Sequence, residues 1–420
     1  MDVTRFAICQ THIAKTIVPI LIVLGLGYLN YACGYALGYK EIYRYHSHAV
    51  AIVFWIILGI LQLNVFLYWG LIVFIGPGKS PRFPPLDIYE TNTSFEQDQV
   101  LIPVPDLFFC DESGYPYYDS HTESIKIERS FYSKDMGYNV IKFDHYCVWI
   151  GCSLGQTNYE FFMKYMIWFL VLFFYVVIFM ACYTRSSMSH GTIDHNFIAI
   201  FVLSGFWIIM IAALFIAHVR YINRNITTLD DITIKQRESY LRWSARQNPD
   251  QIDQPKKPQG GFVAWLLKDK PPPRFETGKR YVNVKIDKFS RKVVEYSVDQ
   301  QYPFDLGFKK NWINLMFNGN RNQGLPESYY TNLRLFLAFY ALVVPYLDIP
   351  LFLTARGKQM DEIGREPDQE QGKREYLIRL YQSYSSHISE NFRAYIDDKI
   401  AKNECQLPSY MTKELNSIES

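Results

Sequence analysis

Four long apolar stretches alternate with polar segments along this chain. They run over 17–37, 49–75, 166–182 and 197–217, and none contains Asp, Glu, Lys or Arg between those limits. A helix needs about 20 apolar residues (range 17–25) to cross the hydrocarbon core of a bilayer, so each stretch is long enough. Tyr and Trp gather near the ends, as in the interfacial belts of membrane proteins. The pattern predicts an α-helical polytopic membrane protein with four transmembrane helices.

The polar segments predict the remaining domains. The expected boundaries are an N-terminus at 1–16, helices one and two within 17–75, a loop domain at 76–162, helices three and four within 163–217, a C-terminal region at 218–355 and a charged tail at 356–420. Lys and Arg near the span ends favour a cytosolic loop domain and cytosolic termini. An even number of spans agrees with that orientation.

The region after the fourth span has its own patterns. Residues 246–273 are rich in Gln, Pro, Lys and Gly, which is typical of a linker. Two alternating runs, 280–287 and 291–298, predict a small β-hairpin. The helical periodicity of 374–402 predicts a helix in the tail.

Residues 335–353 form a further apolar segment that is interrupted by Pro345, Asp348 and Pro350. A charge and two prolines disfavour a fifth span. We expect a re-entrant or surface-lying segment instead.

Charge and cysteine content narrow the functional class. The net charge of +2 gives no global basic field, so nucleic acid is not expected as a partner. Seven cysteines without paired spacing do not form a disulfide framework. A reducing cytosol would keep a cysteine of the loop domain free.

The sequence Asp144-His145-Tyr146-Cys147 lies in the loop domain and combines a thiol, an imidazole and a carboxylate. In an extended backbone, His145 and Cys147 point to the same side, while Tyr146 points away. Nucleophile, base and orienting carboxylate are the components of covalent catalysis by a thiolate. The alternative from these residues alone is a packed cysteine beside a surface histidine.

The chain resembles the DHHC family of protein S-acyltransferases, in the fungal form that lacks ankyrin repeats and has Tyr in place of the second His. The resemblance covers about 15–317 and depends on motifs that occur in the family's order. These are Gly76-Pro77-Gly78 after span two, Asp144 to Cys147 followed by Trp149, Gly155 and Asn158, the segment Asn225-Ile226-Thr227-Thr228-Leu229-Asp230, and Tyr302 to Gly307 followed by Asn311-Trp312.

The resemblance implies a two-step protein-cysteine S-palmitoyltransferase reaction. Cys147 would take a long-chain acyl group, palmitoyl in the expected case, from acyl-CoA, with His145 as base and Asp144 orienting it. The acyl group would then pass to cysteine thiols of membrane-associated proteins. The expected partners are therefore palmitoyl-CoA, such proteins and the bilayer, and the active site would face the cytosol of an unspecified membrane.

The resemblance also implies supporting residues around the site. Tyr146 replaces the second histidine of the motif, and Thr227, Thr228 and Asn311 would support the site without taking part in the chemistry. The alternatives are a helix cap that involves Thr228 and a turn at Asn311.

The family's loop normally binds two zinc ions, but this chain lacks the ligands. The matching positions are Asp119, Thr122, Tyr132, Ser133, Met136, Asn139, Tyr146 and Ser153, and none is Cys or His. Structural zinc prefers four N or S ligands. We therefore expect no bound metal, with a site from Cys110, His121 and Cys152 as a less favoured alternative.

Other interactions must replace the contribution of zinc to the folding free energy, which is about 10–16 kcal/mol in zinc-finger peptides. We expect an aromatic core in the loop, because buried aromatics are worth about 1.5–3 kcal/mol each. The candidates are Tyr117, Tyr118, Phe131, Tyr132, Tyr138, Phe143 and Tyr146.

Two other functions compete with the transferase. A member of this family that lost activity would act as a membrane scaffold or adaptor, and the loss of zinc ligands motivates this alternative. A transporter or channel is disfavoured because the four apolar stretches contain no Asp, Glu, Lys or Arg.

Overall fold

Four helices of the computed structural model are long and apolar enough to cross a membrane, which confirms the predicted polytopic helical fold. They are Lys15–Tyr43, His48–Ile75, Tyr159–Ser189 and His195–Arg224. The structure describes residues 3–88, 101–189, 194–247, 279–287, 290–298, 301–317, 327–345, 370–385 and 388–412.

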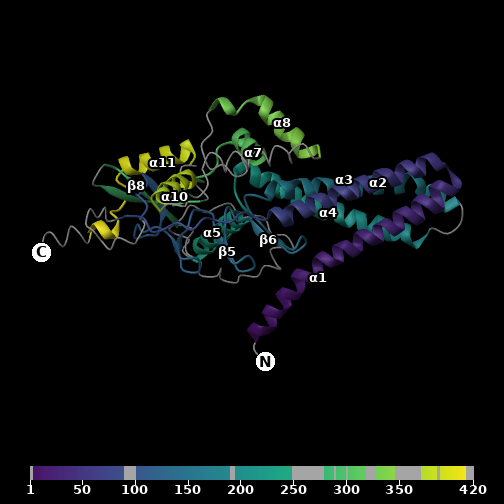
Figure 1. Cartoon of the computed structure of the whole chain (residues 1–420), viewed down its shortest axis with the longest axis horizontal. Coiled ribbons are helices and arrows are strands. Elements are labelled where there is room, and N and C mark those ends of the chain that lie inside the picture. The colour runs from purple at the N-terminus through teal and green to yellow at the C-terminus, as the bar shows by residue number, and fades with distance from the viewer. Residues whose placement is uncertain are drawn as a thin grey trace.

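The first span combines two kinds of helix. Helix α1 (Val3–Tyr31) continues directly into the π-helix η1 (Ala32–Tyr43). The next helices are α2 (His48–Ile75), α3 (Tyr159–Ser189) and α4 (His195–Arg224). In the bundle α3 packs against both α2 and α4, whereas α1 diverges from the others toward the N-terminus (Figure 1).

The helices extend beyond the apolar stretches, and the added turns contain charged residues. Helix α3 starts at Tyr159 and so includes Glu160 and Lys164, whose side chains are 4% and 0% exposed. The first span includes Glu41, which is 4% exposed and lies 3.1 Å from His46 Nε2. The absence of charge therefore holds for the apolar stretches but not for the whole helices.

The loop between α2 and α3 folds into short antiparallel strands at one end of the bundle. Three two-stranded pairs form within it: β2 with β3, β4 with β5, and β6 with β7. Their bounds are β1 (Leu107–Cys110), β2 (Tyr118–Asp119), β3 (Ser124–Ile125), β4 (Phe131–Ser133), β5 (Tyr138–Val140), β6 (His145–Cys147) and β7 (Cys152–Leu154).

The predicted hairpin is confirmed and gains an unpredicted third strand. Strands β8 (Lys279–Lys285) and β9 (Arg291–Ser297) pair antiparallel. Strand β1 of the loop joins on the other side of β8, with Leu107 opposite Val284. A four-residue strand such as β1 has too short a pattern to reveal a partner about 170 residues away.

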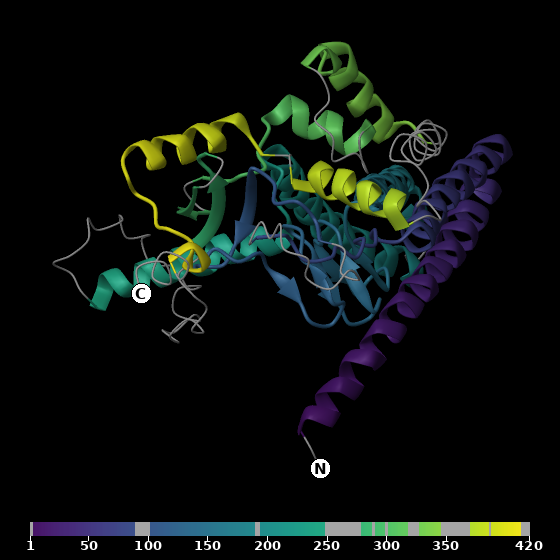
Figure 2. The same ribbon diagram turned by 60° about the vertical axis from the view of Figure 1, so that its left-hand side comes forward.

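The remaining helices surround this end of the molecule. They are α5 (Thr228–Gln247), α7 (Phe308–Phe317), the 3₁₀ turn η2 (Glu327–Tyr329), α8 (Asn332–Val343), α10 (Glu370–Ser385) and α11 (Glu390–Ala401). The periodic segment 374–402 therefore forms parts of two helices, and Ser389 caps the second by accepting from Phe392 N. Helix α11 lies beside β8 and β9 (Figure 2).

The apolar segment 335–353 is only partly within the described residues. Helix α8 covers its first part and is too short to span a bilayer. Ala338 and Ala341 are buried, whereas Leu333 and Phe336 are 67% and 64% exposed. Residues 346–353, and the predicted linker beyond residue 247, lie outside the described part of the chain.

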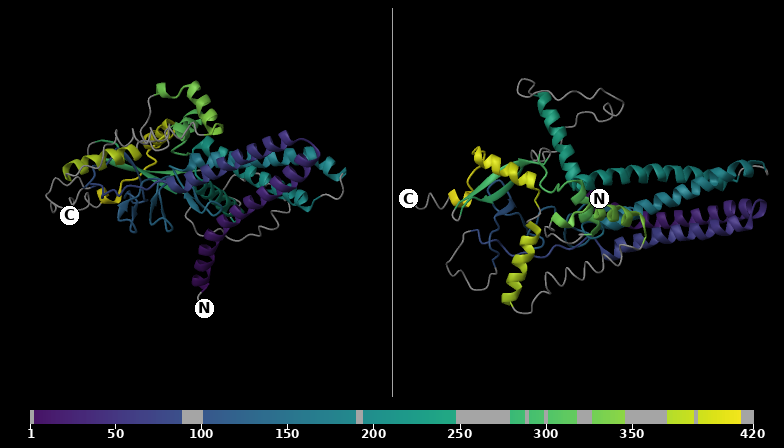
Figure 3. Two further views of the ribbon diagram at one scale, coloured as in Figure 1. Left: turned by 45° about the vertical axis from the view of Figure 1, so that its right-hand side comes forward. Right: turned by 90° about the horizontal axis from the view of Figure 1, so that it is seen from above.

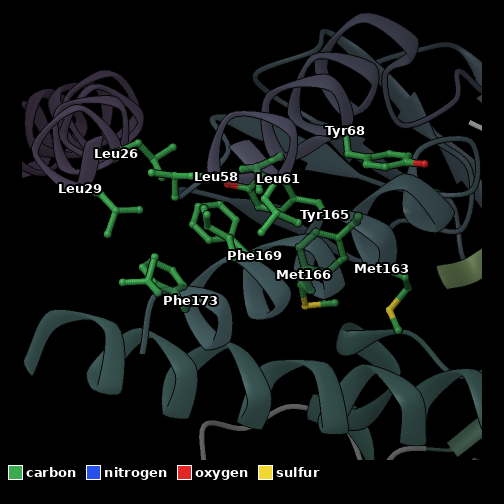
Figure 4. Close-up of a cluster of buried hydrophobic side chains, with 14 of the residues drawn as sticks. Leu26, Leu29, Leu58, Leu61, Tyr68, Met163, Tyr165, Met166, Phe169 and Phe173 are labelled. Atoms are coloured by element: carbon green, nitrogen blue, oxygen red, sulfur yellow. The ribbon is translucent and has the colours of Figure 1, made fainter. Parts of the chain in front are cut away.

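The largest hydrophobic core lies in the bundle and reaches the end of the loop. It includes Cys147 and Leu154 as well as residues of all four spans. Figure 4 shows Leu26 and Leu29 of α1 facing Phe169 and Phe173 of α3. The start of α3, which follows the loop, and the end of α4, which precedes the C-terminal region, are seen from above in the right-hand view of Figure 3.

Candidate active site

A short hairpin presents the candidate nucleophile to the bundle. Strand β6 pairs with β7, so that His145 lies opposite Leu154 and Cys147 opposite Cys152. Gly151 closes the turn with φ +78°, a conformation that favours glycine. Alternation along β6 places His145 and Cys147 on one side and Tyr146 on the other, as predicted.

Close backbone packing fixes this hairpin to the ends of α2 and α3. A Cβ on Gly155 would lie 2.4 Å from the Pro77 carbonyl oxygen, so only glycine fits there. The buried Asn158 donates to the carbonyls of Ile72 at 3.2 Å and Ser153 at 3.0 Å. The motif residues Pro77, Gly155 and Asn158 therefore hold the hairpin at the membrane end of the loop.

The Asp144 carboxylate is the most constrained group of the site. Its side chain is 1% exposed. Asp144 Oδ2 accepts from His145 Nδ1 at 2.6 Å and from Thr228 Oγ1 at 2.7 Å, and Oδ1 accepts from Thr228 N at 2.8 Å. These bonds fix the imidazole and leave its other nitrogen, Nε2, free to hydrogen-bond with Cys147.

Electrostatics favour a charged pair at the site. Burial raises the pKa of Asp144, but the hydrogen bond and charge of His145, together with the hydrogen bond from Thr228, hold that pKa below its usual value. Burial lowers the pKa of His145, but hydrogen bonds with Asp144 and Cys147 raise it to about 9. At neutral pH the imidazole is therefore protonated, and a cation beside a thiol favours the thiolate.

Cys147 opens into an apolar cavity of about 460 Å³ between α1, α3 and α4. This volume is in the range of small-molecule sites. The lining is almost wholly hydrophobic and consists of Leu21, Ile22, Gly25, Leu26, Leu29, Cys147, Trp149, Ile150, Phe162, Tyr165, Met166, Phe169, Phe173, Leu203, Trp207, Met210, Ile211 and Leu214. The shape and chemistry suit a long hydrocarbon chain that ends at the Cys147 sulfur.

The two neighbouring threonines have different contacts. Thr228 holds Asp144, as described above. Thr227 caps α5, because its Oγ1 accepts from Asp230 N at 3.2 Å while Asp230 Oδ2 accepts from Thr227 N at 2.8 Å. The cap expected at Thr228 is therefore formed by Thr227.

Asn311 lies farther from the chemistry and joins α7 to the end of α4. Its Nδ2 donates to Asn223 O and to Asp305 Oδ1, both at 2.9 Å. The next residue, Trp312, donates to Asn223 Oδ1 at 2.8 Å. Asn311 is thus more than a turn residue, because it fixes the helix end that precedes Thr228.

Tyr146 faces away from Cys147 and toward α1. The Lys15 ammonium lies 4.7 Å from the centroid of its ring and also pairs with Asp135. This cation–π contact connects the first span to the β6–β7 hairpin.

The positions that match the family's zinc ligands do not fit zinc. Asp119 Oδ2 accepts from Thr122 Oγ1 at 2.6 Å and from Asn139 Nδ2 at 2.8 Å, and Asn139 Nδ2 also donates to Thr122 Oγ1 at 2.8 Å. Ser133 Oγ and Ser153 Oγ lie 3.4 Å apart. We call Asp119, Thr122 and Asn139 the polar cluster. Its hydroxyl, carboxylate and amide N–H groups bond one another and offer none of the N or S ligands that structural zinc prefers.

The expected aromatic core of the loop was wrong. All seven candidates are half-buried or exposed, and Tyr118 is 56% exposed. Most buried positions are aliphatic or small and polar, among them Ile125, Val140 and Ser130, and the loop's fully buried rings, Phe83 and Phe108, were not among the candidates. Strands of two or three residues leave no continuous inner face for large rings. Several rings instead pack against cations, for example Phe131 under Lys126 at 4.3 Å.

A second predicted alternative, a metal site from Cys110, His121 and Cys152, is not formed by the described residues. Cys110 lies in β1 against β8, Cys152 is in the β6–β7 hairpin, and His121 stacks on Tyr132 with ring centroids 4.9 Å apart.

Two residues near the site were missed by sequence reasoning. His218 is 1% exposed on α4 and lies just beyond the apolar limit at 217. Lys142 has φ +46° and donates to Asn225 Oδ1 at 2.7 Å. Burial lowers the pKa of Lys142 to about 7, with a further lowering from Arg129. A basic residue two positions before Asp144 was the available signal.

Comparison with known proteins gives consistent matches. Residues 112–235 match the family model described as DHHC palmitoyltransferase. The chain is 52% identical to palmitoyltransferase PFA5 of Candida albicans over 95% of this chain and 93% of that protein. It is 32% identical to palmitoyltransferase PFA5 of Candida glabrata over 53% of this chain and 62% of that one. The corresponding protein of Saccharomyces cerevisiae is 27% identical over 54% of this chain and 65% of its own length.

Proposed function

Since the chain belongs to the DHHC palmitoyltransferase family, we propose that its protein S-palmitoyltransferase activity uses Cys147 as the thiol that carries the acyl group. The observation behind this proposal is that one sulfur meets both an apolar cavity and a histidine held by a carboxylate. Asp144, His145 and Cys147 are the proposed catalytic residues.

The first step loads the enzyme. The Cys147 thiolate attacks the thioester carbonyl of acyl-CoA, a new carbon–sulfur bond forms, and the bond to the CoA sulfur breaks. Protonated His145 gives its proton to the leaving CoA thiolate and becomes neutral. The Asp144 carboxylate keeps the imidazole oriented through both states.

The second step transfers the acyl group from Cys147 to the protein substrate. Neutral His145 takes the proton from a cysteine of the protein substrate, and the resulting thiolate attacks the Cys147 thioester. The acyl group moves to the substrate, and Cys147 leaves as thiolate beside protonated His145. Both steps exchange one thioester for another, so the enzyme mainly supplies position and thiolate.

The cavity of Cys147 is the proposed site of the acyl chain. Each buried CH₂ is worth about 0.8 kcal/mol, so a C16 chain contributes on the order of 10 kcal/mol of gross binding energy. The palmitoyl group in the names of the relatives is the proposed donor group for this chain.

The catalytic loop and the C-terminal region are proposed to face the cytosol, where the protein substrates and acyl-CoA would reach Cys147. Both follow an even number of spans and lie at the same end of the bundle (Figure 1). The Lys and Arg that flank the spans support the same side.

The loop is proposed to fold without zinc. The polar cluster supports this, because Asp119, Thr122 and Asn139 bind one another where the family has zinc ligands. Hydrogen bonds of about 0.5–1.5 kcal/mol each are weaker than a zinc site, so burial elsewhere must supply the rest. Docking on helices α10 and α11, which pack against the loop and the three-stranded sheet, provides such burial.

Acyl labelling tests the proposal. The purified protein is incubated with a clickable palmitoyl-CoA analogue, and hydroxylamine-labile label is measured on the parent chain, on Cys147→Ser and on Cys182→Ser. Cys182 is exposed near the far end of α3 and serves as a matched control. We expect label on the parent and on Cys182→Ser but not on Cys147→Ser. Equal label on all three, or none on the parent, would favour the scaffold alternative.

A further inference from the structure

A second histidine, His218, lies beside the catalytic pair and takes no part in the two transfer steps. Its side chain is 1% exposed, and its Nδ1 lies 2.7 Å from the Tyr159 hydroxyl oxygen. Single ligand atoms of Asp144, His145 and His218 all lie within 4.8 Å of one another. The ring of His218 is thus close enough to both members of the pair to influence them directly.

Aromatic contacts hold the His218 ring in place. Its centroid lies 5.0 Å from that of Phe162 in an edge-to-face arrangement and 5.3 Å from that of Tyr221. The His145 ring lies 5.9 Å away on another side. A ring enclosed in this way has little rotational freedom, so the nitrogen that faces the catalytic pair stays there.

The hydrogen bond to Tyr159 assigns the roles of the two nitrogens. When the Tyr159 hydroxyl donates to Nδ1, a neutral imidazole carries its proton on Nε2. A ligand atom of this imidazole lies within 4.8 Å of one of Asp144. Three donor contacts from His145 and Thr228 already occupy this carboxylate, so the nearby imidazole of His218 adds its dipole to a charge that is otherwise fixed.

The same three residues have the spacing of a metal site, but their bonds point to another use. His145 Nδ1 is directed at Asp144 Oδ2, and Thr228 bonds both oxygens of that carboxylate. A cation would have to displace these bonds to bind. Support of the catalytic pair requires no such displacement.

We propose that His218, held by Tyr159, is a positioning residue that keeps the Asp144–His145 pair aligned with Cys147. His218 and Thr228 then hold Asp144 from two places on one segment, because the chain changes direction at Asn225 (φ +51°) between them. Helix α4 thereby sets the geometry of the loop chemistry. This inference deepens the proposed function and rests on it.

Single-turnover loading by palmitoyl-CoA tests the inference with two substitutions of opposite character. His218→Phe keeps the ring shape without an N–H, whereas His218→Gln keeps an N–H near the position of Nε2 without the ring. Misplacement by about 1 Å can cost 10²-fold in rate, so we expect His218→Phe to load about 10–100-fold more slowly with an almost unchanged KM. We expect His218→Gln to recover most of the rate. His195→Phe, at the exposed opposite end of α4, is the matched control.

A double-mutant cycle adds an independent readout. If Tyr159 acts through His218, Tyr159→Phe slows loading in the parent chain but has no further effect in His218→Phe. Normal loading by His218→Phe, or better loading by His218→Phe than by His218→Gln, would overturn the inference and show a packing role only. Failure of the parent chain itself to load would instead overturn the proposed function, so the two failures are distinguishable.

Discussion

The β6–β7 hairpin and the polar cluster both lie in a loop of short strands, but different interactions hold them in place. The hairpin keeps a carboxylate, an imidazole and a thiol whose charges depend on one another. The polar cluster lies where the family resemblance implies zinc ligands, and its side chains bind each other. Chemistry that needs a nucleophile tolerates no substitute, whereas support can be supplied by any bonds of sufficient total strength.

The difference also appears in what surrounds each region. Asp144 is fixed by residues from beyond the fourth span, and Cys147 opens into the membrane bundle. The polar cluster is formed by residues of the loop alone, within about 20 positions of one another. Damage to the hairpin should therefore change the reaction, while damage to the polar cluster should change stability.

Substitution of the aspartate in each region gives the largest expected contrast. In Asp144→Asn the amide cannot accept all three hydrogen bonds and favours the wrong imidazole tautomer, so loading should fall about 10²–10⁴-fold. Single-turnover loading measures this effect. A rate within threefold of the parent would remove Asp144 from the mechanism.

Asp119→Ala tests the other region. The loss of the carboxylate removes the acceptor of the Thr122 hydroxyl and one of the two acceptors of the Asn139 amide, which costs about 1–3 kcal/mol of unfolding free energy. Thermal unfolding in detergent should detect this cost, while loading per folded molecule stays unchanged. Slower loading without loss of stability would contradict the division between the two regions.

The pH dependence of stability and of the loading rate should also differ between variants of the two regions. The raised pKa of His145, about 9, means that the protonated ring stabilises the fold fully below about pH 6.5 and that this contribution is lost as pH rises through 9. Loading needs the same proton for the CoA leaving group, so its rate should fall about tenfold per pH unit above 9. Asp119→Ala should show this alkaline limb unchanged, and His145→Gln should lack it.

Lys15 gives the smallest expected effect. Its cation–π contact with Tyr146 and its pair with Asp135 join α1 to the back of the hairpin. Exposed contacts of this kind are worth about 0.5–1 kcal/mol, so Lys15→Gln should lower stability by that amount and loading by less than threefold. Loss of loading would mean that α1 takes part in catalysis.

Patterns in the sequence predicted the four spans, the β8–β9 hairpin and the placement of His145 and Cys147 on one side, because each depends on local periodicity. The third strand β1 and the position of His218 could not be predicted, since both depend on contacts between distant segments. The aromatic core failed for a related reason. Whether a ring is buried depends on how the strands pack, and composition alone does not show it.

Loading of a chelator-treated protein tests the central claim most directly. The purified chain is treated with a strong chelator, its zinc content is measured, and palmitoyl transfer to Cys147 is followed by peptide mass. We expect no stoichiometric zinc before or after treatment and an undiminished thioester on Cys147. Stoichiometric zinc whose removal abolishes loading, with recovery on adding zinc back, would contradict the account.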